Sequence, residues 1–124
     1  MILPAERPLI YVRSPYTADD PLKVQANVHR ARVLGAKIHA TGLAWAIVPH
    51  NASRGLEHTL TPVEWYAYCL ALLRVSKAVW WSGMRSTGCD LEAAEEARLN
   101  LRSGTEGSDE LVPFLKTVCE AGAQ

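Results

Sequence analysis

The sequence contains little of what would bind a nucleic-acid polymer or cross a membrane. Its 13 Lys and Arg residues balance 13 Asp and Glu residues. Binding a polymer backbone needs clustered cations that displace counterions, and because no basic run occurs, we expect no nucleic-acid polymer as partner. No apolar run approaches the roughly 18 residues that would span a membrane, and residues 1–7 lack the apolar segment of a signal peptide. A small anionic ligand is compatible with this composition, since one Arg and a few backbone amides suffice to hold a phosphate.

Cysteine is also scarce, and its spacing excludes the common metal and redox motifs. Cys69, Cys89 and Cys119 form neither a zinc knuckle nor a CxxC pair. We therefore predict reduced thiols in a cytoplasmic protein. No set of ligands is spaced around a histidine to complete a metal site, and the glycine-rich fingerprint of dinucleotide-binding proteins is missing. The function is thus expected to need neither a metal nor an organic cofactor.

Strand-like and helix-like segments alternate along the 124 residues. This length favours a single domain over residues 1–124, with a core over about 8–120. The hydrophobic periodicity predicts the following elements. They are a strand at 8–13, a helix at 21–41, a buried strand at 43–50, a helix at 62–75, a strand at 77–82, a helix ending near 99, a weak edge strand at 101–105 and a helix opened by 108–111. Such an order implies an α/β fold in three layers, with a parallel sheet of four to five strands between helices.

Polar residues mark the predicted helix ends. Thr61 and Glu64 have the spacing of a capping box, in which each side chain bonds the other residue's backbone N–H. Ser86 or Thr87 is the expected N-cap of the following helix. Asn100 is expected to end that helix in the left-handed conformation.

Three loops are the expected site, because ligands of open parallel sheets bind beyond the carboxyl ends of the strands. These loops are 13–20, 49–60 and 82–90, and the residues capable of chemistry concentrate in them.

The first strand and its loop offer Tyr11, Arg13, Ser14, Tyr16 and Thr17. Tyr11 lies near the end of the strand, where its hydroxyl either faces a site or packs in the core. Arg13 and Ser14 could hold an anion or ribose hydroxyls, or they form an ordinary polar turn. In the second loop, His50 stands at the strand end and is either structural or part of the site.

The third loop carries the pattern Ser86-x-Gly88-x-x-x-Glu92. It places a hydroxyl and backbone amides at a helix N-terminus, and Gly88 permits close approach of a ligand to the backbone. Glu92 lies about one turn further in, where it either serves catalysis or merely complements the helix dipole. Glu95 and Glu96 are expected on the surface. A serine nucleophile is not expected, because no GxSxG motif occurs.

Several segments together resemble a known family. "LIYVRSPYT", a helix with Asn27 and Ala31, "VPH", "EWYAYCLALL" and "STGCDLEAAEEA" occur in the order found in the nucleoside 2-deoxyribosyltransferase-like superfamily. The chain looks closest to small members similar to the 2′-deoxynucleoside 5′-phosphate N-hydrolases. The resemblance covers about residues 8–120, and Ser-x-Gly-x-x-x-Glu is its most specific piece. It implies a flavodoxin- or Rossmann-like sandwich and usually a homodimer, or a higher homo-oligomer, in which the partner chain closes the site.

The resemblance also implies roles for individual residues. Glu92 matches the nucleophile that attacks C1′ of a deoxyribose, and Tyr11 matches the tyrosine that positions sugar and nucleophile. Ser86 and Gly88 match residues at the 5′ end of the substrate, and His50 matches the residue after the second strand. The expected activity is cleavage or transfer of the N-glycosidic bond of a (deoxy)nucleoside or its 5′-monophosphate.

One departure from the family opens an alternative. In the family, an Asp on the second helix assists departure of the base, and Cys69 occupies that position here. A thiol is a poor general acid at neutral pH. Either Asp90, His50 or a substrate group does this work, or the chain is a non-catalytic module that senses a nucleotide. The family's glycine-rich first loop is replaced by "RSPYTADD", which leaves nucleoside and nucleotide both open as substrate.

Overall fold

Four parallel strands form one sheet in the computed structural model, which describes residues 6–52 and 59–122. The order of the strands across the sheet is β2-β1-β3-β4. Ile10 at the centre lies opposite Ala46 of β2 and Ala78 of β3. Along the chain, the elements are β1 (Leu9–Arg13), α1 (Pro21–Ala40), β2 (Trp45–Ile47), α2 (Pro49–Ala52), α3 (Pro62–Arg74), β3 (Ala78–Trp81), α4 (Thr87–Arg98), β4 (Arg102–Thr105) and α5 (Leu111–Gly122).

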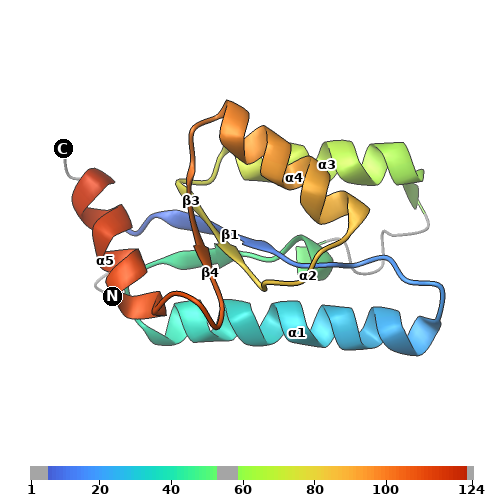
Figure 1. Cartoon of the computed structure of the whole chain (residues 1–124), viewed down its shortest axis with the longest axis horizontal. Coiled ribbons are helices and arrows are strands. Elements are labelled where there is room, and N and C mark those ends of the chain that lie inside the picture. Colours follow the sequence, from blue (N-terminus) through green and yellow to red (C-terminus); the bar gives the residue numbers. More distant parts are fainter. Residues whose placement is uncertain (1–5, 53–58, 123–124) are drawn as a thin grey trace, which may run out of the picture.

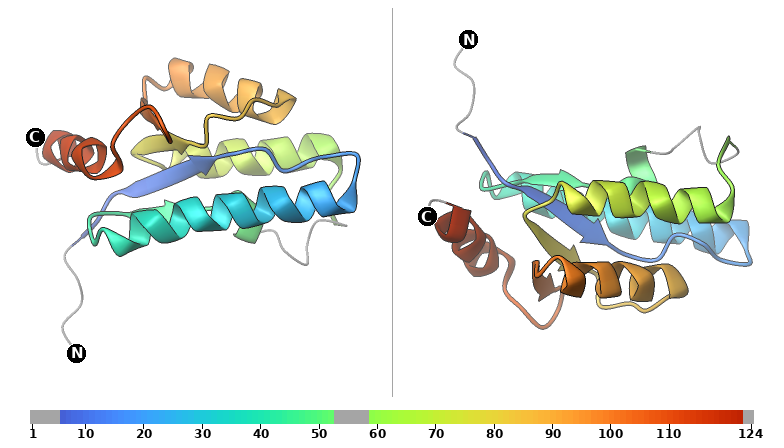
Figure 2. Two further views of the ribbon diagram at one scale, coloured as in Figure 1. Left: turned by 60° about the horizontal axis from the view of Figure 1, so that its bottom comes forward. Right: turned by 90° about the horizontal axis from the view of Figure 1, so that it is seen from above.

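Helices cover both faces of this sheet, as Figures 1 and 2 show. The alternation of side chains along β1 divides the core accordingly. Ile10 and Val12 pack with residues of α1 and α5. Tyr11 points to the other face, where it packs with Cys69 and Leu73 of α3. The three-layer α/β sandwich of Rossmann or flavodoxin type that we predicted is therefore confirmed.

A fully buried tryptophan fixes the edge of the sheet near β4. Trp80 is 1% exposed and packs against Phe114 of α5 at a ring-centroid distance of 5.3 Å. Its ring requires Gly104 on β4, because a Cβ there would lie 2.6 Å from Trp80 Cζ3. The predicted weak edge strand is thus real, and glycine allows it to approach the core.

The predicted helix ends are confirmed. Thr61 and Glu64 form both bonds of the capping box. Ser86, rather than Thr87, is the N-cap of α4 and accepts a hydrogen bond from the Cys89 backbone N–H at 3.0 Å. Asn100 has φ 55° and ends the helix in the left-handed conformation.

The prediction of a buried strand over 43–50 was wrong. The strand spans only Trp45–Ile47, and Pro49 and His50 begin the short helix α2. β2 lies at the edge of the sheet with β1 on one side, and the Trp45 side chain is 39% exposed, with the Arg7 guanidinium over its ring. Most of the polar loop expected at 51–60 lies outside the described residues.

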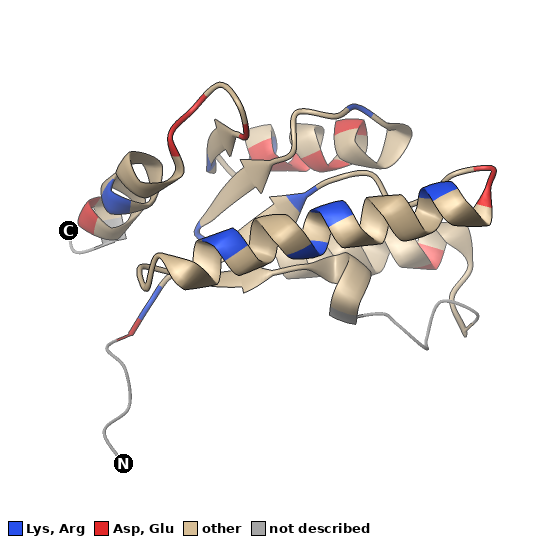
Figure 3. Ribbon diagram, turned by 90° about the horizontal axis from the view of Figure 1, so that it is seen from below, with Lys and Arg blue, Asp and Glu red and all other residues tan. Residues whose placement is uncertain are grey.

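Charge is distributed unequally between the two helical layers (Figure 3). α1 carries Lys and Arg but no acid, whereas α4 carries four acids and one Arg.

No helix among the described residues combines the length and apolar character that crossing a membrane requires. The topological switch point of the sheet lies between β1 and β3, because the chain passes from β1 to β2 on one side and then to β3 on the other. In such sheets the loops after the two central strands lead to opposite faces and leave a crevice between them.

Candidate functional site

A cavity of about 330 Å³ lies where the chain leaves the carboxyl ends of β1, β2 and β3. Its volume is in the range of small-molecule sites. The walls come from the loop after β1, the start of α2, one side of α3 and the first turns of α4. They are Ser14, Tyr16, Thr17, Pro49, His50, Trp65, Tyr66, Cys69, Ser86, Thr87, Gly88, Cys89 and Glu92.

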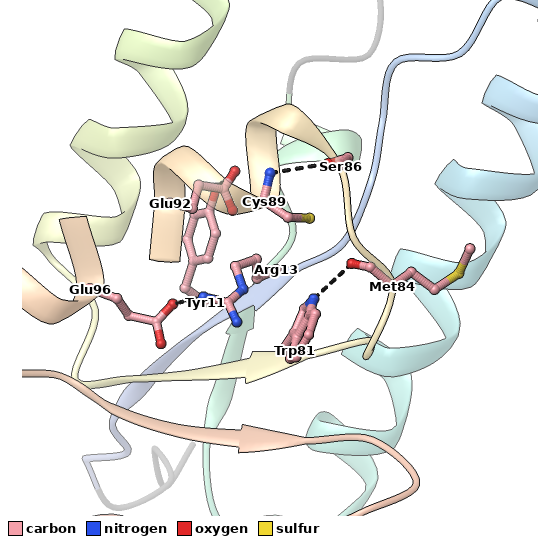
Figure 4. Close-up of polar contacts among 8 residues, drawn as sticks. All are labelled: Tyr11, Arg13, Trp81, Met84, Ser86, Cys89, Glu92 and Glu96. Carbon is pink, nitrogen blue, oxygen red and sulfur yellow. Dashed lines mark hydrogen bonds and ion pairs between the residues drawn. The ribbon is translucent and has the colours of Figure 1, made fainter. Parts of the chain in front are cut away.

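Glu92 meets Tyr11 of β1 at one wall of this cavity. Glu92 is in the second turn of α4, lines the cavity and is 8% exposed. The hydroxyl of fully buried Tyr11 donates a hydrogen bond to Glu92 Oε1 at 2.9 Å (Figure 4). Glu92 Oε2 is buried and has no hydrogen-bond partner among the described residues. One carboxylate oxygen is thus oriented by the protein and the other is unpaired.

The surroundings of Glu92 change its acidity. Burial raises its pKa to about 7, opposed by the Tyr11 hydrogen bond and the charge of Arg13 and reinforced by the charge of Glu96. Part of the Glu92 carboxyls therefore stays protonated at neutral pH. Burial and the neighbouring Glu92 raise the pKa of Tyr11 well above its usual value, so its hydroxyl remains a donor.

Cys69 stands beside this pair, on α3. Burial and then the charge of Glu92 raise the pKa of its thiol to about 12, although a hydrogen bond with Tyr11 opposes the rise. The thiol is therefore neutral at physiological pH and far too weak an acid to replace a carboxyl group. All three cysteines are free thiols.

His50 is held by two backbone carbonyls. Its Nε2 lies 2.9 Å from the Ser14 carbonyl oxygen and 3.0 Å from that of Pro15, so the proton of the ring is on Nε2. Burial lowers the pKa of His50, which keeps the ring neutral. Because its only proton points to the protein backbone, His50 is poorly placed to protonate a leaving group. The Tyr16 ring packs edge-on against it at 5.6 Å and contacts Trp65 at 4.9 Å.

The start of α4 forms another wall. Ser86 caps the helix through its hydroxyl and still lines the cavity. A Cβ at Gly88 would lie 3.1 Å from Tyr66 Cε1, so the absence of a side chain lets the helix N-terminus approach α3 closely. The backbone N–H groups at this N-terminus favour an anionic or strongly polar ligand group.

Three candidates from the sequence do not line the cavity: Tyr11, which reaches it only through its bond to Glu92, and Arg13 and Asp90. The Arg13 guanidinium forms an ion pair with Glu96 and lies over the Trp81 ring, 4.7 Å from its centroid. Asp90 points outward, with a side chain 58% exposed that pairs with Arg85 at 3.6 Å. The Asp90 carboxyl group therefore faces away from the cavity.

The expectation that Glu96 lies on the surface was wrong. Glu96 is 6% exposed, and it is buried because Arg13 of β1 reaches it beneath the helix. Glu95 is also less exposed than expected, with 13% of its side chain accessible, and it pairs with Arg98 and Arg74. Its pKa is lowered chiefly by the hydrogen bond from Arg98.

The sequence did not single out several residues that line the cavity, including Trp65, Tyr66 and Cys89. For α3 the sequence did contain a signal, namely the four-residue spacing that places Trp65 on the same side of the helix as Cys69. The same spacing is equally typical of a core-facing helix.

The arrangement suits acid–base or nucleophilic chemistry by a carboxylate. Over the residues 6–52 and 59–122, no group of three or more His, Cys, Asp or Glu side chains could hold a metal ion. Comparison of the chain with protein-family models, curated proteins and solved structures finds no match.

Proposed function

We propose that this protein cleaves or transfers the N-glycosidic bond of a (deoxy)nucleoside or nucleoside 5′-monophosphate, with Glu92 as the nucleophile. The observation that carries the proposal is the 2.9 Å hydrogen bond from Tyr11 to Glu92 Oε1, which leaves the buried Oε2 unpaired in a residue that lines the cavity. A carboxylate held in this way is suited to attack an electron-poor sugar carbon.

The reaction would proceed in two displacements at C1′ of the sugar. Glu92 Oε2 forms an ester bond to C1′ while the C1′–N bond breaks, and the electron pair leaves with the base, which takes a proton from water. Water or a second base then attacks C1′, the ester bond breaks and the Glu92 carboxylate is restored. The proton released by the attacking water or base balances the one that the first base took up.

The walls of the cavity fit this class of substrate. The rings of Tyr16, Trp65 and Tyr66 offer flat apolar surface for a nucleobase. Ser14 and Ser86 offer hydroxyls for the sugar or its phosphate, and the Ser14 Oγ has no partner among the described residues. The absence of a basic surface run is consistent with a monomeric substrate rather than a polymer.

The test is to incubate the protein with a panel of nucleosides and 5′-monophosphates and to measure the release of free base by chromatography. We expect the unmodified protein to release base and the rate of release to fall at least about 10³-fold in Glu92→Gln. Asp90→Asn on the same helix is the matched control and should retain the rate. Release that continues undiminished in Glu92→Gln would rule out the mechanism.

The second candidate is a nucleotide-binding module that does not turn over its ligand. It is favoured by Cys69, whose thiol stays neutral where the resembling enzymes have an acid. Thermal unfolding with nucleosides and nucleotides separates the two. A ligand at 100 times its Kd stabilises the folded state by about 2.7 kcal/mol, with or without turnover. A shift in Tm without release of base would establish the module.

The remaining properties follow from this proposal. A substrate of this class and three free thiols suit a cytoplasmic protein. We expect a homodimer or higher homo-oligomer whose partner chain closes the cavity, and light scattering on the purified protein tests this expectation.

A further inference from the structure

Two residues of β1 and two residues of α4, the proposed nucleophile among them, form a buried polar cluster. Tyr11 and Arg13 are two positions apart on the strand and so point to the same face. Glu92 and Glu96 are four apart on the helix and share one side. Tyr11 bonds Glu92, and Arg13 pairs with Glu96. Figure 4 shows the Arg13 guanidinium between Glu96 and Trp81.

The charges in this cluster are unequal. It holds one guanidinium and two carboxyl groups, all less than a tenth exposed. Arg13 is bonded to Glu96 only, yet its charge also lowers the pKa of Glu92, while the charge of Glu96 raises it. The two glutamates therefore compete for one cation.

Two buried polar atoms of this cluster lack a hydrogen-bond partner among the described residues. The Arg13 Nε is a buried donor without a partner among the described residues, and Glu92 Oε2 is a buried acceptor in the same condition. Buried polar atoms without partners are uncommon and are destabilising. A guanidinium released from Glu96 would bond Glu92 Oε2 and satisfy both atoms.

We propose that Glu96 is a positioning residue that holds Arg13 away from Glu92, so that Oε2 of the nucleophile stays unpaired. This role rests on the proposed function of Glu92. Trp81 supports it by stacking on the guanidinium, and its own ring is fixed by a hydrogen bond from Nε1 to the Met84 carbonyl at 2.8 Å. A charge-assisted bond from Arg13 would stabilise the carboxylate and withdraw the electron pair that attacks C1′.

Other titratable groups facing Glu92 do not carry charge at neutral pH. Tyr11 of β1, Cys69 of α3 and Cys89 of α4 all have a pKa raised by burial. Arg13 and Glu96 are therefore the charged neighbours on which the ionisation of Glu92 depends.

The test is a ¹³C NMR titration of the Glu92 carboxyl group, assigned by its disappearance in Glu92→Gln. Glu96→Gln removes the competitor, and we expect the pKa of Glu92 to fall by about one pH unit or more, a tenfold loss of proton affinity. Glu95→Gln, one position away and paired with surface arginines, is the matched control and should leave it unchanged. An unchanged or higher pKa in Glu96→Gln would overturn the proposal.

A double variant keeps the proposal testable if Glu96→Gln does not fold. Arg13→Met with Glu96→Leu replaces the whole pair by apolar side chains, which buried ion pairs often tolerate. With Arg13 gone, we expect the pKa of Glu92 to remain at about 7 or above. A fall as large as in Glu96→Gln would show that Arg13 is not involved.

Kinetics separate this role from a merely structural one. In Glu96→Gln we expect kcat to fall at least about tenfold with KM unchanged, together with a lower pH midpoint of the rate. The titration needs no turnover, so it decides the role of Glu96 even if no base is released. Absence of base release by the unmodified protein would count against the proposed function alone.

Discussion

Glu92→Gln should stabilise the fold in a pH-dependent manner. Glu92 is 8% exposed, and burial raises the pKa of its carboxyl from 4.5 to about 7. The ionised side chain is thus less stable in the folded protein than in the unfolded chain. An amide at this position carries no charge, and its oxygen still accepts the hydrogen bond from Tyr11.

The magnitude follows from the two pKa values. Between pH 4.5 and 7 the folded protein holds a proton on Glu92 that the unfolded chain has lost, so stability falls as pH rises. Above pH 7 both states are ionised, and the full cost of about 3 kcal/mol is present. The stabilisation by Glu92→Gln should therefore grow by about 3 kcal/mol between pH 4 and pH 8.5.

Urea unfolding followed by tryptophan fluorescence measures this difference, because the chain has four tryptophans. The unmodified protein and Glu92→Gln are compared at both pH values, so that all other titrating groups cancel. Glu120→Gln, at an exposed position of α5, is the control variant. An effect of Glu92→Gln that is equal at pH 4 and pH 8.5 would refute the reasoning.

Three further outcomes are expected. Because the attacking group must be ionised, kcat/KM should rise about tenfold per pH unit below the Glu92 pKa of about 7 and level off above it; a rate that falls over this range in steady-state assays would show that Glu92 acts as an acid. Cys69→Asp places an acid beside Glu92 and should speed base release at least about 10²-fold, whereas Cys69→Ser, the control, should not. Gly104→Ala places a Cβ 2.6 Å from the Trp80 ring and should destabilise the fold by about 1–3 kcal/mol in urea titrations, and an unchanged midpoint would contradict the packing described for β4.

The layered fold could be predicted from sequence because local signals agree with one another. The strand-like runs that became β1 and β3 are flanked by helices with clear caps, such as the capping box at Thr61 and Glu64. The error at β2 has a physical cause. An apolar run such as "LAWAIVPH" looks the same whether the strand is central or at an edge, and only the strand order exposes Trp45.

The site was partly predictable for a similar reason. Strand order brings the three loops to one edge, and the resemblance singles out Glu92 and Tyr11, which the structure places in contact. The pairing of Arg13 with Glu96 was not predicted, because a four-residue spacing on a helix does not reveal which strand residue lies beneath it. The aromatic side chains of α3 that line the cavity, Trp65 and Tyr66, were not predicted, because Trp65 is spaced as a core residue would be.

The central claim is that Glu92 forms a covalent bond to the sugar, and the most direct measurement is intact-protein mass spectrometry after acid quench during turnover. We predict a protein heavier by one sugar residue, with the added mass on the peptide that contains Glu92 and absent from Glu92→Gln. Release of base by the unmodified protein with no sugar ester at any time, or with the ester on another residue, would contradict the account.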